Sequence, residues 1–294
     1  MAKTARIIDG KKVAAEIRKE IQAEVAALKK RKIVPGLAVV LVGDDPASQV
    51  YVRHKEKACA ELGIRSFIHR RPAKTSERAL LNLIAKLNKD PRVHAFIVQS
   101  PLPKHIDEMK VLNAIDPAKD ADGFHPVSVG KLLNGEETFL PPTPHGVQQL
   151  LLRYGYDPSG KHVVIVGRSN IVGKPLAALL MQKAPGANAT VTVCHSRTKK
   201  LSTITKQADI LVAAMGQPGF ITARMVKEGA VVIDVGTSRV ADKTKKSGFR
   251  LAGDVDFRGV SKKAKAITPV PGGVGPMTVT MLLKNAVIAA QKKR

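Results

Sequence analysis

The chain has 294 residues, 44% of them hydrophobic and 25% charged, so it is long enough for two globular domains. No apolar run reaches the roughly 18 residues of a membrane helix, and the start lacks a signal-peptide core, so we expect a cytoplasmic protein. The two cysteines, Cys59 and Cys194, lie in apolar segments and are expected as buried thiols. No Cys or His pair has zinc-site spacing, so no metal is expected.

The charge is strongly basic: 49 Lys and Arg stand against 24 acidic residues, a formal net charge of +25. A nucleic-acid-binding protein is one interpretation, but its footprint would be a basic stripe with aromatic residues for stacking. Here Trp is absent, aromatic residues make up 3%, and the basic residues are spread along the chain. These features argue against nucleic acid as the main partner, although such a field attracts small anions.

Short apolar runs alternate with longer amphipathic stretches, which is typical of βαβ units and predicts an α/β fold with parallel sheets. The predicted strands are Leu37–Gly43, Arg65–His69, Ala95–Gln99, His162–Gly167, Thr190–His195, Ile210–Met215, Val231–Val235 and Leu251–Val255. The predicted helices are Val13–Leu28, Ser48–Leu62, Glu77–Asn88, Thr143–Tyr154, Pro175–Lys183 and Met277–Gln291.

A boundary is predicted within Phe139–Gly146, where prolines occupy three of four positions from Pro141 to Pro144. Prolines fit neither a central strand nor a helix interior, so a stiff crossing between two α/β domains is expected here. A second βαβ series then begins at His162.

The second series opens with a strand, a glycine-containing turn and a helix. The turn, Gly167-Arg168-Ser169-Asn170-Ile171-Val172-Gly173, resembles the dinucleotide fingerprint, with Ser169 at the middle glycine position. Glycines let the backbone approach a pyrophosphate, and the helix N-terminus offers free N–H groups. The sequence therefore predicts a Rossmann-type nucleotide site, with an ordinary structural turn as the alternative.

The strand after this turn indicates which cofactor is bound. NAD sites end it with Asp or Glu on the ribose, whereas here Cys194-His195-Ser196-Arg197 contains no acid. Arg168 and Ser196, with Arg197 as a further candidate, could hold a 2′-phosphate through charge-assisted hydrogen bonds, so NADP is favoured. The alternative is that both arginines are ordinary surface residues.

In the first half, Tyr51 and Lys55 are one helical turn apart, and Cys59 and Leu62 continue that face. Lys55 therefore has apolar neighbours. It either extends its amine to water or is a partly desolvated amine with a lowered pKa, suited to proton transfer. Three further segments carry candidate chemistry: Val98–Pro103, Asp120–Pro126 and Ile267–Thr278.

Together and in this order these segments resemble the bifunctional methylenetetrahydrofolate dehydrogenase/methenyltetrahydrofolate cyclohydrolase family. The resemblance spans nearly the whole chain, and the run Pro269-Val-Pro271-Gly-Gly-Val-Gly-Pro276-Met-Thr278 is its most specific part. Two positions depart from the family pattern: Ser100 stands where Leu is usual, and Pro142 where Cys is common.

The resemblance implies a folate-binding catalytic domain over residues 1–142 plus 277–294 and a Rossmann NADP-binding domain over 143–276, with a folate cleft between them. It implies Lys55 as the central catalytic residue, assisted by Gln99, with Tyr51 on the aminobenzoyl group and Asp122 on the pterin. The implied folate-binding residues are Tyr51, Gln99, Pro101, Asp122, Pro271, Gly272 and Gly273. The implied NADP-binding residues are Gly167, Arg168, Ser169, Ile171, Val172, Gly173, Ser196 and Thr143.

The resemblance also implies a homodimer and tetrahydrofolate substrates that carry polyglutamate tails. Its reactions would be NADP-dependent oxidation of methylenetetrahydrofolate and hydrolysis of the methenyl product. Two alternatives stay open: a dehydrogenase with weak or lost hydrolase activity, and a basic nucleotide-binding or RNA-binding protein on the same fold.

Overall fold

The computed structural model describes residues 4–245 and 248–292. Its contacts divide the chain into two compact units. The three-stranded unit contains Ala15–Pro142 and the chain from Val279 onward; the six-stranded unit contains the chain up to Ala14 and Thr143–Thr278. The expected boundaries differ from this division at two places, because residues up to 14 and residues 277–278 belong to the six-stranded unit.

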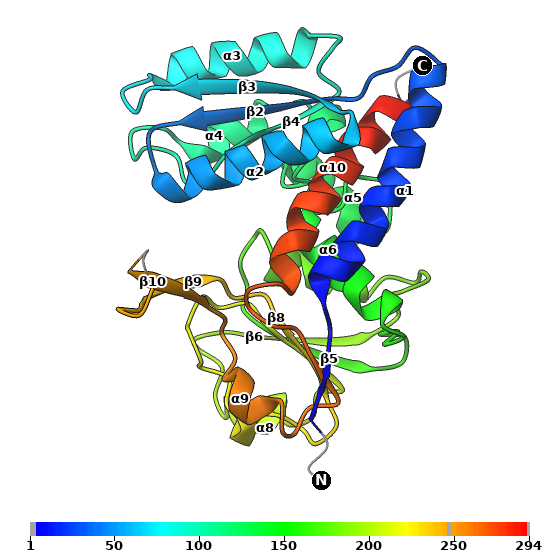
Figure 1. Cartoon of the computed structure of the whole chain (residues 1–294), viewed down its shortest axis with the longest axis vertical. Helices are drawn as coiled ribbons and strands as arrows, with labels where there is room; N and C mark the ends of the chain where they lie inside the picture. Colours follow the sequence, from blue (N-terminus) through cyan, green and yellow to red (C-terminus); the bar gives the residue numbers. More distant parts are fainter. Residues whose placement is uncertain (1–3, 246–247, 293–294) are drawn as a thin grey trace. The chain divides into compact units, whose positions relative to one another are not determined.

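The three-stranded unit is built on a parallel sheet with strand order β3-β2-β4. Its strands are β2 (Gly36–Val42), β3 (Arg65–Arg71) and β4 (Ala95–Val98). Every residue of β2 is buried, which explains its continuous apolar sequence. Helix α2 (Pro46–Leu62) covers one face of the sheet and α3 (Glu77–Lys89) covers the other (Figure 1).

Further helices complete this unit. They are α1 (Gly10–Lys30), α4 (Glu108–Asn113), the 3-10 turn η1 (Pro117–Lys119), α5 (Pro126–Asn134) and α10 (Val274–Lys292). The division between the units falls inside α1 and α10. After η1 the chain runs parallel to β4, with a bridge between Phe96 and Asp120. This run carries the chain from the beginning of β4 toward its carboxyl end, where Asp122 follows.

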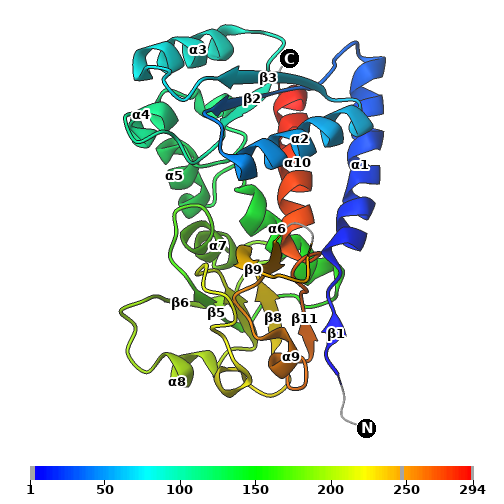
Figure 2. The same ribbon diagram turned by 60° about the vertical axis from the view of Figure 1, so that its left-hand side comes forward.

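The six-stranded unit is a parallel sheet with strand order β1-β11-β8-β7-β5-β6. Its strands are β1 (Arg6–Ile7), β5 (His162–Val166), β6 (Thr190–Cys194), β7 (Ile210–Ala213), β8 (Val231–Asp234) and β11 (Ala266–Ile267). Figure 2 shows β8, β11 and β1 side by side. Since β6 and β7 pair with opposite sides of β5, strand order reverses there, and such a switch point is where open α/β sheets bind ligands.

Four shorter elements accompany this sheet: α6 (Pro142–Arg153), α7 (Gly173–Leu180), α8 (Leu201–Thr205) and α9 (Phe257–Val260), together with the 3-10 turn η2 (Ala223–Met225). The proline-rich crossing predicted near residue 142 includes the start of α6. Pro142 and Pro144 lie in its first turn, where a missing N–H leaves no intrahelical bond unmade.

One predicted strand does not lie in the parallel sheet. The run Leu251–Val255 was expected to join the parallel sheet, but β10 (Phe249–Ala252) forms an antiparallel pair with β9 (Ser238–Ala241). The parallel position beside β8 is taken by β11, and β1 extends the sheet beyond it. Strands β1 and β11 have only two residues each, too few to show the hydrophobic pattern of a strand in the sequence.

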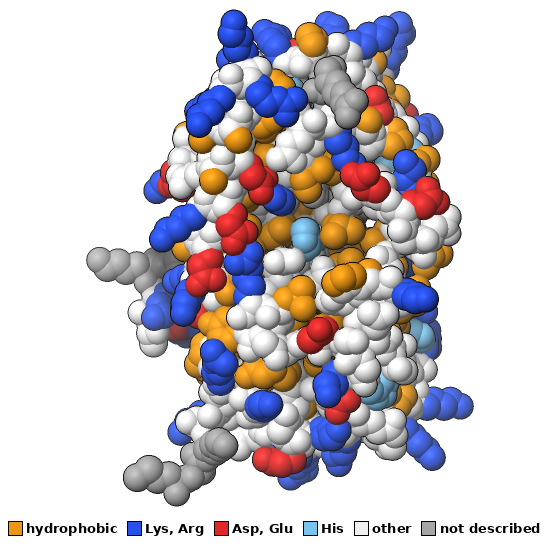
Figure 3. All heavy atoms as spheres, turned by 90° about the vertical axis from the view of Figure 1, so that its right-hand side faces the viewer, with side chains coloured by type: hydrophobic (Ala, Val, Ile, Leu, Met, Phe, Trp, Pro, Cys, Tyr) orange, Lys and Arg blue, Asp and Glu red, His pale blue; other side chains and the backbone are white. Residues whose placement is uncertain are grey.

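On the face drawn in Figure 3, Lys and Arg side chains are scattered among acidic, apolar and uncharged groups. Among the described residues, no helix is long and apolar enough to cross a membrane, and no cluster of three His, Cys, Asp or Glu could hold a metal ion.

Candidate functional site

Lys55 lies on the sheet-facing side of α2. That helix begins where Asp45 accepts a hydrogen bond from the Ser48 backbone N–H (2.7 Å), with Pro46 in the first turn. The Lys55 side chain is only 9% exposed, whereas Tyr51, one turn earlier, is 46% exposed. The four-residue spacing puts the pair on one side of the helix, with the amine enclosed and the aromatic ring exposed.

Gln99 is the direct partner of the Lys55 amine. Lys55 Nζ donates to Gln99 Oε1 at 2.8 Å, and Gln99 Nε2 donates to the Ser100 carbonyl oxygen at 2.8 Å. The second bond fixes which amide atom faces the lysine. Because Gln99 directly follows β4, the pair lies at the carboxyl edge of the sheet, the usual ligand-binding edge. Pro101 follows over the cis Ser100–Pro101 bond and is exposed.

Burial shifts the protonation of both charged groups at this edge. It lowers the pKa of Lys55, while the nearby carboxylate of Asp122 acts in the opposite direction. It raises the pKa of Asp122 to about 6, against the influence of Lys55. Burial also raises the pKa of the Cys59 thiol to about 12, so this neighbour is no nucleophile at neutral pH. The edge thus holds an amine with a lowered pKa and a carboxyl with a raised one, beside a thiol that stays protonated.

Asp120 is a residue whose task the sequence did not indicate. It is buried and accepts hydrogen bonds from the backbone N–H of Gly123 (3.1 Å), from that of His125 (2.8 Å) and from the Ser128 hydroxyl (2.9 Å). These bonds hold the turn that carries Asp122. The only sequence signal was the Asp-x-Asp-Gly pattern, which is shared by many ordinary turns.

The loop with Pro271, Gly272 and Gly273 belongs to the six-stranded unit. The Gly272 carbonyl oxygen accepts hydrogen bonds from the backbone N–H groups of Gly10 (2.9 Å) and Lys11 (3.2 Å). A Cβ at Gly10 would overlap the Gly273 carbonyl, so the opening segment lies directly against the loop. The chain's opening residues therefore support this loop, a task that their position in the sequence did not reveal.

The predicted nucleotide turn follows β5 and leads into α7. The Ser169 hydroxyl accepts from the backbone N–H groups of Val172 (3.1 Å) and Gly173 (3.4 Å), which closes the turn in place of a middle glycine. A Cβ at Gly167 would overlap the Ala214 carbonyl oxygen, and a Cβ at Gly173 would overlap that of Gly167. Gly167 also has φ +133°. Glycine is required at both positions because the backbone packs closely.

The outer residues of this site fit a phosphorylated dinucleotide. Arg168 and Ile171 are exposed on the turn, and Ser196 and Arg197 are exposed on the turn after β6. Those turns lie together because Gly167 N donates to the Cys194 carbonyl oxygen at 2.8 Å. With basic and hydroxyl groups there and no acid on residues 194–198, the site suits a 2′-phosphate.

Thr143 lies away from the phosphate turn in the sequence and is bonded to the last helix. Its hydroxyl is 2.8 Å from that of Thr278, and a Cβ at Gly146 would crowd Met277. The six-stranded unit thus carries the nucleotide turn, Thr143 and the Pro271 loop, while the three-stranded unit carries Tyr51, Lys55, Gln99 and Asp122.

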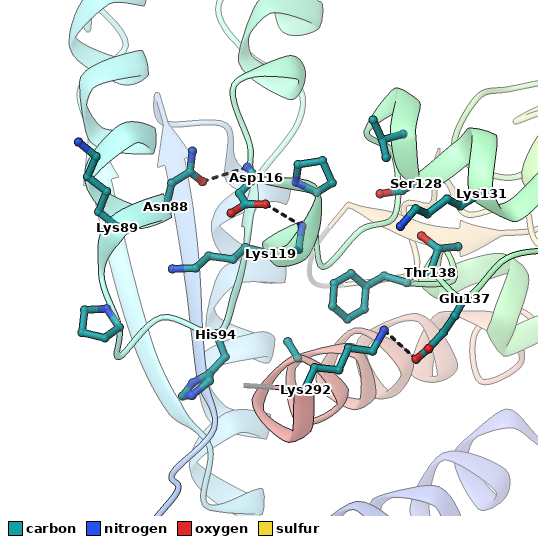
Figure 4. A pocket seen from close by; sticks show the side chains of 16 residues that line it. Asn88, Lys89, His94, Asp116, Lys119, Ser128, Lys131, Glu137, Thr138 and Lys292 are labelled. Carbon is teal, nitrogen blue, oxygen red and sulfur yellow. Dashed lines mark hydrogen bonds and ion pairs between the residues drawn. The ribbon is translucent and has the colours of Figure 1, made fainter. Parts of the chain in front are cut away.

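A separate cavity of about 660 Å³ in the three-stranded unit opens near the start of β4, the edge opposite Gln99 (Figure 4). Four lysines line it, and two of them, Lys119 and Lys292, have protein partners. Lys119 donates to the carbonyls of Leu87 and Asp90 (both 2.9 Å), and Lys292 pairs with Glu137 (2.8 Å). This cavity is not the candidate active site.

Comparison with known proteins identifies the family. The model of the tetrahydrofolate dehydrogenase/cyclohydrolase catalytic domain matches residues 8–122, and that of the NAD(P)-binding domain matches residues 141–294. The chain belongs to this family.

Individual relatives agree over nearly the full length. The chain is 62% identical over 290 residues to the bifunctional protein FolD of Dehalococcoides mccartyi, with 98% of each covered. Among solved structures, it superposes on the bifunctional FolD enzyme of Campylobacter jejuni with a TM-score of 0.93 and 48% identity, over 99% of this chain and 100% of that one. The Trypanosoma brucei FolD, solved with NADP cofactor and an inhibitor, gives a TM-score of 0.93 at 44% identity, with 98% of each chain covered.

Proposed function

We propose that the protein oxidises 5,10-methylenetetrahydrofolate to the methenyl form with NADP and then hydrolyses that product to 10-formyltetrahydrofolate. The observation that carries the proposal is the enclosed Lys55 amine, bonded to Gln99 and beside Asp122, in a family member with a complete nucleotide turn. The three-stranded unit would be the folate-binding catalytic part and the six-stranded unit the NADP-binding part.

The first reaction requires positioning more than acid–base chemistry. When bound, NADP accepts a hydride from the methylene carbon, and the folate nitrogens stabilise the cation that remains. Tyr51 would support the aminobenzoyl ring, and Asp122 would bind the pterin through its carboxylate. Pro101 and the Pro271, Gly272 and Gly273 loop would complete the folate site.

The second reaction requires proton transfer at defined atoms. Water adds to the methenyl carbon and loses a proton. The ring opens when one carbon–nitrogen bond breaks and its nitrogen gains a proton, and the remaining hydroxyl group loses its proton to become the formyl carbonyl. Lys55 Nζ would move these protons, since its lowered pKa allows the neutral amine to form at lower cost. Gln99 Oε1 would keep the amine in place.

For the cofactor, Gly167, Ser169, Val172 and Gly173 would approach the pyrophosphate, with Ile171 on the outer side of the turn. Arg168 and Ser196 would hold the 2′-phosphate, and Thr143 would lie at the reacting end. The features that support NADP are the missing acid after β6 and the exposed guanidinium of Arg168.

A spectrophotometric assay tests both activities. Purified protein with methylenetetrahydrofolate and NADP should form the methenyl compound, which should then disappear. The control supplies the methenyl compound without NADP, and hydrolysis should continue. Lasting accumulation of the methenyl compound would favour the dehydrogenase-only alternative. Absence of any NADP-dependent oxidation would contradict the proposal.

We further propose a cytoplasmic homodimer that associates through the six-stranded unit. Strand β6 ends the sheet order, and Met181 and Val193 near it are 50% and 36% exposed, which leaves apolar surface beside an open strand edge. Both cysteines are free and buried, as in proteins of reducing compartments. Light scattering after size-exclusion chromatography should give twice the chain mass of 31.5 kDa.

A further inference from the structure

Two buried carboxylates lie at the carboxyl edge of the six-stranded sheet, and the mechanism above uses neither. Asp234 ends β8 and is 3% exposed; Asp254 follows β10 and is completely buried. Buried acids are costly unless hydrogen bonds compensate them, so their partners indicate their task.

Asp254 binds the loop that follows β7. Its Oδ2 accepts hydrogen bonds from the backbone N–H groups of Met215 (2.7 Å) and Gly216 (2.9 Å). The residue before them, Ala214, is the one whose carbonyl lies against Gly167 of the phosphate turn. The Ala214–Gly216 loop therefore connects Asp254 to Gly167, the first glycine of the phosphate turn.

Asp234 in turn holds Asp254. Its Oδ1 accepts from the backbone N–H of Asp254 (2.9 Å) and its Oδ2 from that of Val255 (3.0 Å). A Cβ at Gly253 would overlap the Asp234 carboxylate, and a Cβ at Gly236 would overlap that of Asp254. The patterns Asp234-Val-Gly236 and Gly253-Asp254 thus form one interlocked unit in which only glycines fit beside the acids.

The hydrogen bonds of Asp234 and Asp254 hold loops, whereas the strands are held by separate ladder hydrogen bonds. Strand β7 is already bound on both sides by its ladders to β5 and β8, and Ala214 N donates to the Val166 carbonyl oxygen at 2.8 Å. Met215 and Gly216 lie beyond those ladders. Loss of the Asp254 acceptor should therefore loosen the loop edge of the site while the sheet stays paired.

We propose that Asp254 is a positioning residue for the cofactor: it holds the Ala214–Gly216 loop against the phosphate turn, and Asp234 holds Asp254. The inference rests on the proposed NADP site at that turn. The residue touches no reacting atom, so its effect should appear in cofactor affinity and not in folate chemistry.

The test is Asp254→Asn, which keeps the shape of the side chain but replaces charge-assisted hydrogen bonds with weaker neutral ones. The KM for NADP should rise about tenfold, equivalent to about 1.4 kcal/mol. Hydrolysis of supplied methenyltetrahydrofolate needs no cofactor, so its kcat and KM should stay within about twofold. Asp256→Asn is the matched control, because Asp256 is exposed and accepts a backbone hydrogen bond within α9 only.

Gly236→Ala provides a second variant, because its methyl group would overlap both the Asp254 carboxylate and the Asp254 backbone nitrogen, and so displace the residue without removing its charge. It should reproduce the rise in KM for NADP. An unchanged KM for NADP in both variants would overturn the inference, as would a parallel loss of oxidation and hydrolysis, which would show a general structural role. Failure of the proposed function would look different, since the unaltered protein would then show no NADP-dependent oxidation.

Discussion

The Lys55 amine has two influences on its protonation that oppose each other. Burial favours the neutral amine, whereas the carboxylate of Asp122 favours the charged one. Gln99 accepts a hydrogen bond from either form, because a neutral amine still carries N–H groups. The arrangement can therefore keep its geometry while the proton moves, which is what repeated proton transfer requires.

Lys55→Met should separate the two activities. The substitution keeps length and packing but removes the amine, so hydrolysis should fall by about 10²–10⁴-fold, the usual contribution of a positioned acid–base group. Oxidation should fall less, through lost positioning alone. Lys55→Arg should not restore hydrolysis, because a guanidinium does not deprotonate near neutral pH.

Both reactions are measured on each variant, with circular dichroism as the control for folding. Equal losses of oxidation and hydrolysis would show that Lys55 mainly orients folate. Full hydrolysis in either variant would remove it from proton transfer.

We expect the pKa of Asp122 to determine the acid side of the pH profile for hydrolysis. Because burial raises it to about 6, the carboxylate is present above that pH and is protonated below it. The kcat/KM for hydrolysis should therefore fall as the pH drops below about 6, since this ratio reports groups of the free enzyme. Asp122→Asn should lower the plateau and abolish this limb. A limb unchanged in the variant would assign it to another group.

Among the elements, the strand, turn and helix from β5 to α7 define the cofactor site. Ser169 closes the turn by accepting hydrogen bonds from the backbone N–H groups of Val172 and Gly173, while the Arg168 side chain is exposed. A substitution at Arg168 should therefore leave the conformation of the turn unchanged.

Arg168→Ala should weaken NADP and leave NAD nearly unchanged. A charge-assisted contact to the 2′-phosphate contributes roughly 1.5–3 kcal/mol, so the preference for NADP should fall about tenfold to a hundredfold. The comparison of kcat/KM for both cofactors measures this, with NAD as the internal control. Equal losses for both would mean that Arg168 supports the turn.

The sequence predicted the buried strands well because a strand covered on both faces is a continuous apolar run, as in Gly36–Val42. It missed β1 and β11, whose two residues carry no period, and α5, whose Pro-Val-Ser-Val-Gly start contains little helix propensity. It could place Tyr51 and Lys55 on one face, since four residues make one turn. It could not pair Lys55 with Gln99 from spacing, because that contact depends on tertiary folding; only the family resemblance suggested it.

At the scale of the whole molecule, the net charge of +25 is distributed and not concentrated in one patch on the face of Figure 3. A distributed field steers anions toward a protein without binding them at one place. Folate tails carry one carboxylate or more for each glutamate, so they are the substrate parts that this field would act on.

Salt should therefore affect long-tailed substrates most. The KM for a polyglutamylated folate should rise with ionic strength more steeply than that for the monoglutamate, because salt at about 0.1 M screens charges beyond about 10 Å. Steady-state assays over a range of NaCl concentrations measure both slopes. Coincident slopes would exclude the tail as the target of the charge, and tight, salt-sensitive RNA binding would favour the nucleic-acid alternative.

The pairing of β1 with β11 also bears on how the protein is made. Strand β1 is translated before every other strand of its sheet, whereas its partner Ala266–Ile267 is translated after every other one. Until Ala266–Ile267 are made, β1 has no neighbour in the sheet, and the opening segment has no Gly272 carbonyl to bind. The six-stranded sheet can therefore close only after its last strand is made, so β5 to β8 are all made before β1 has its partner.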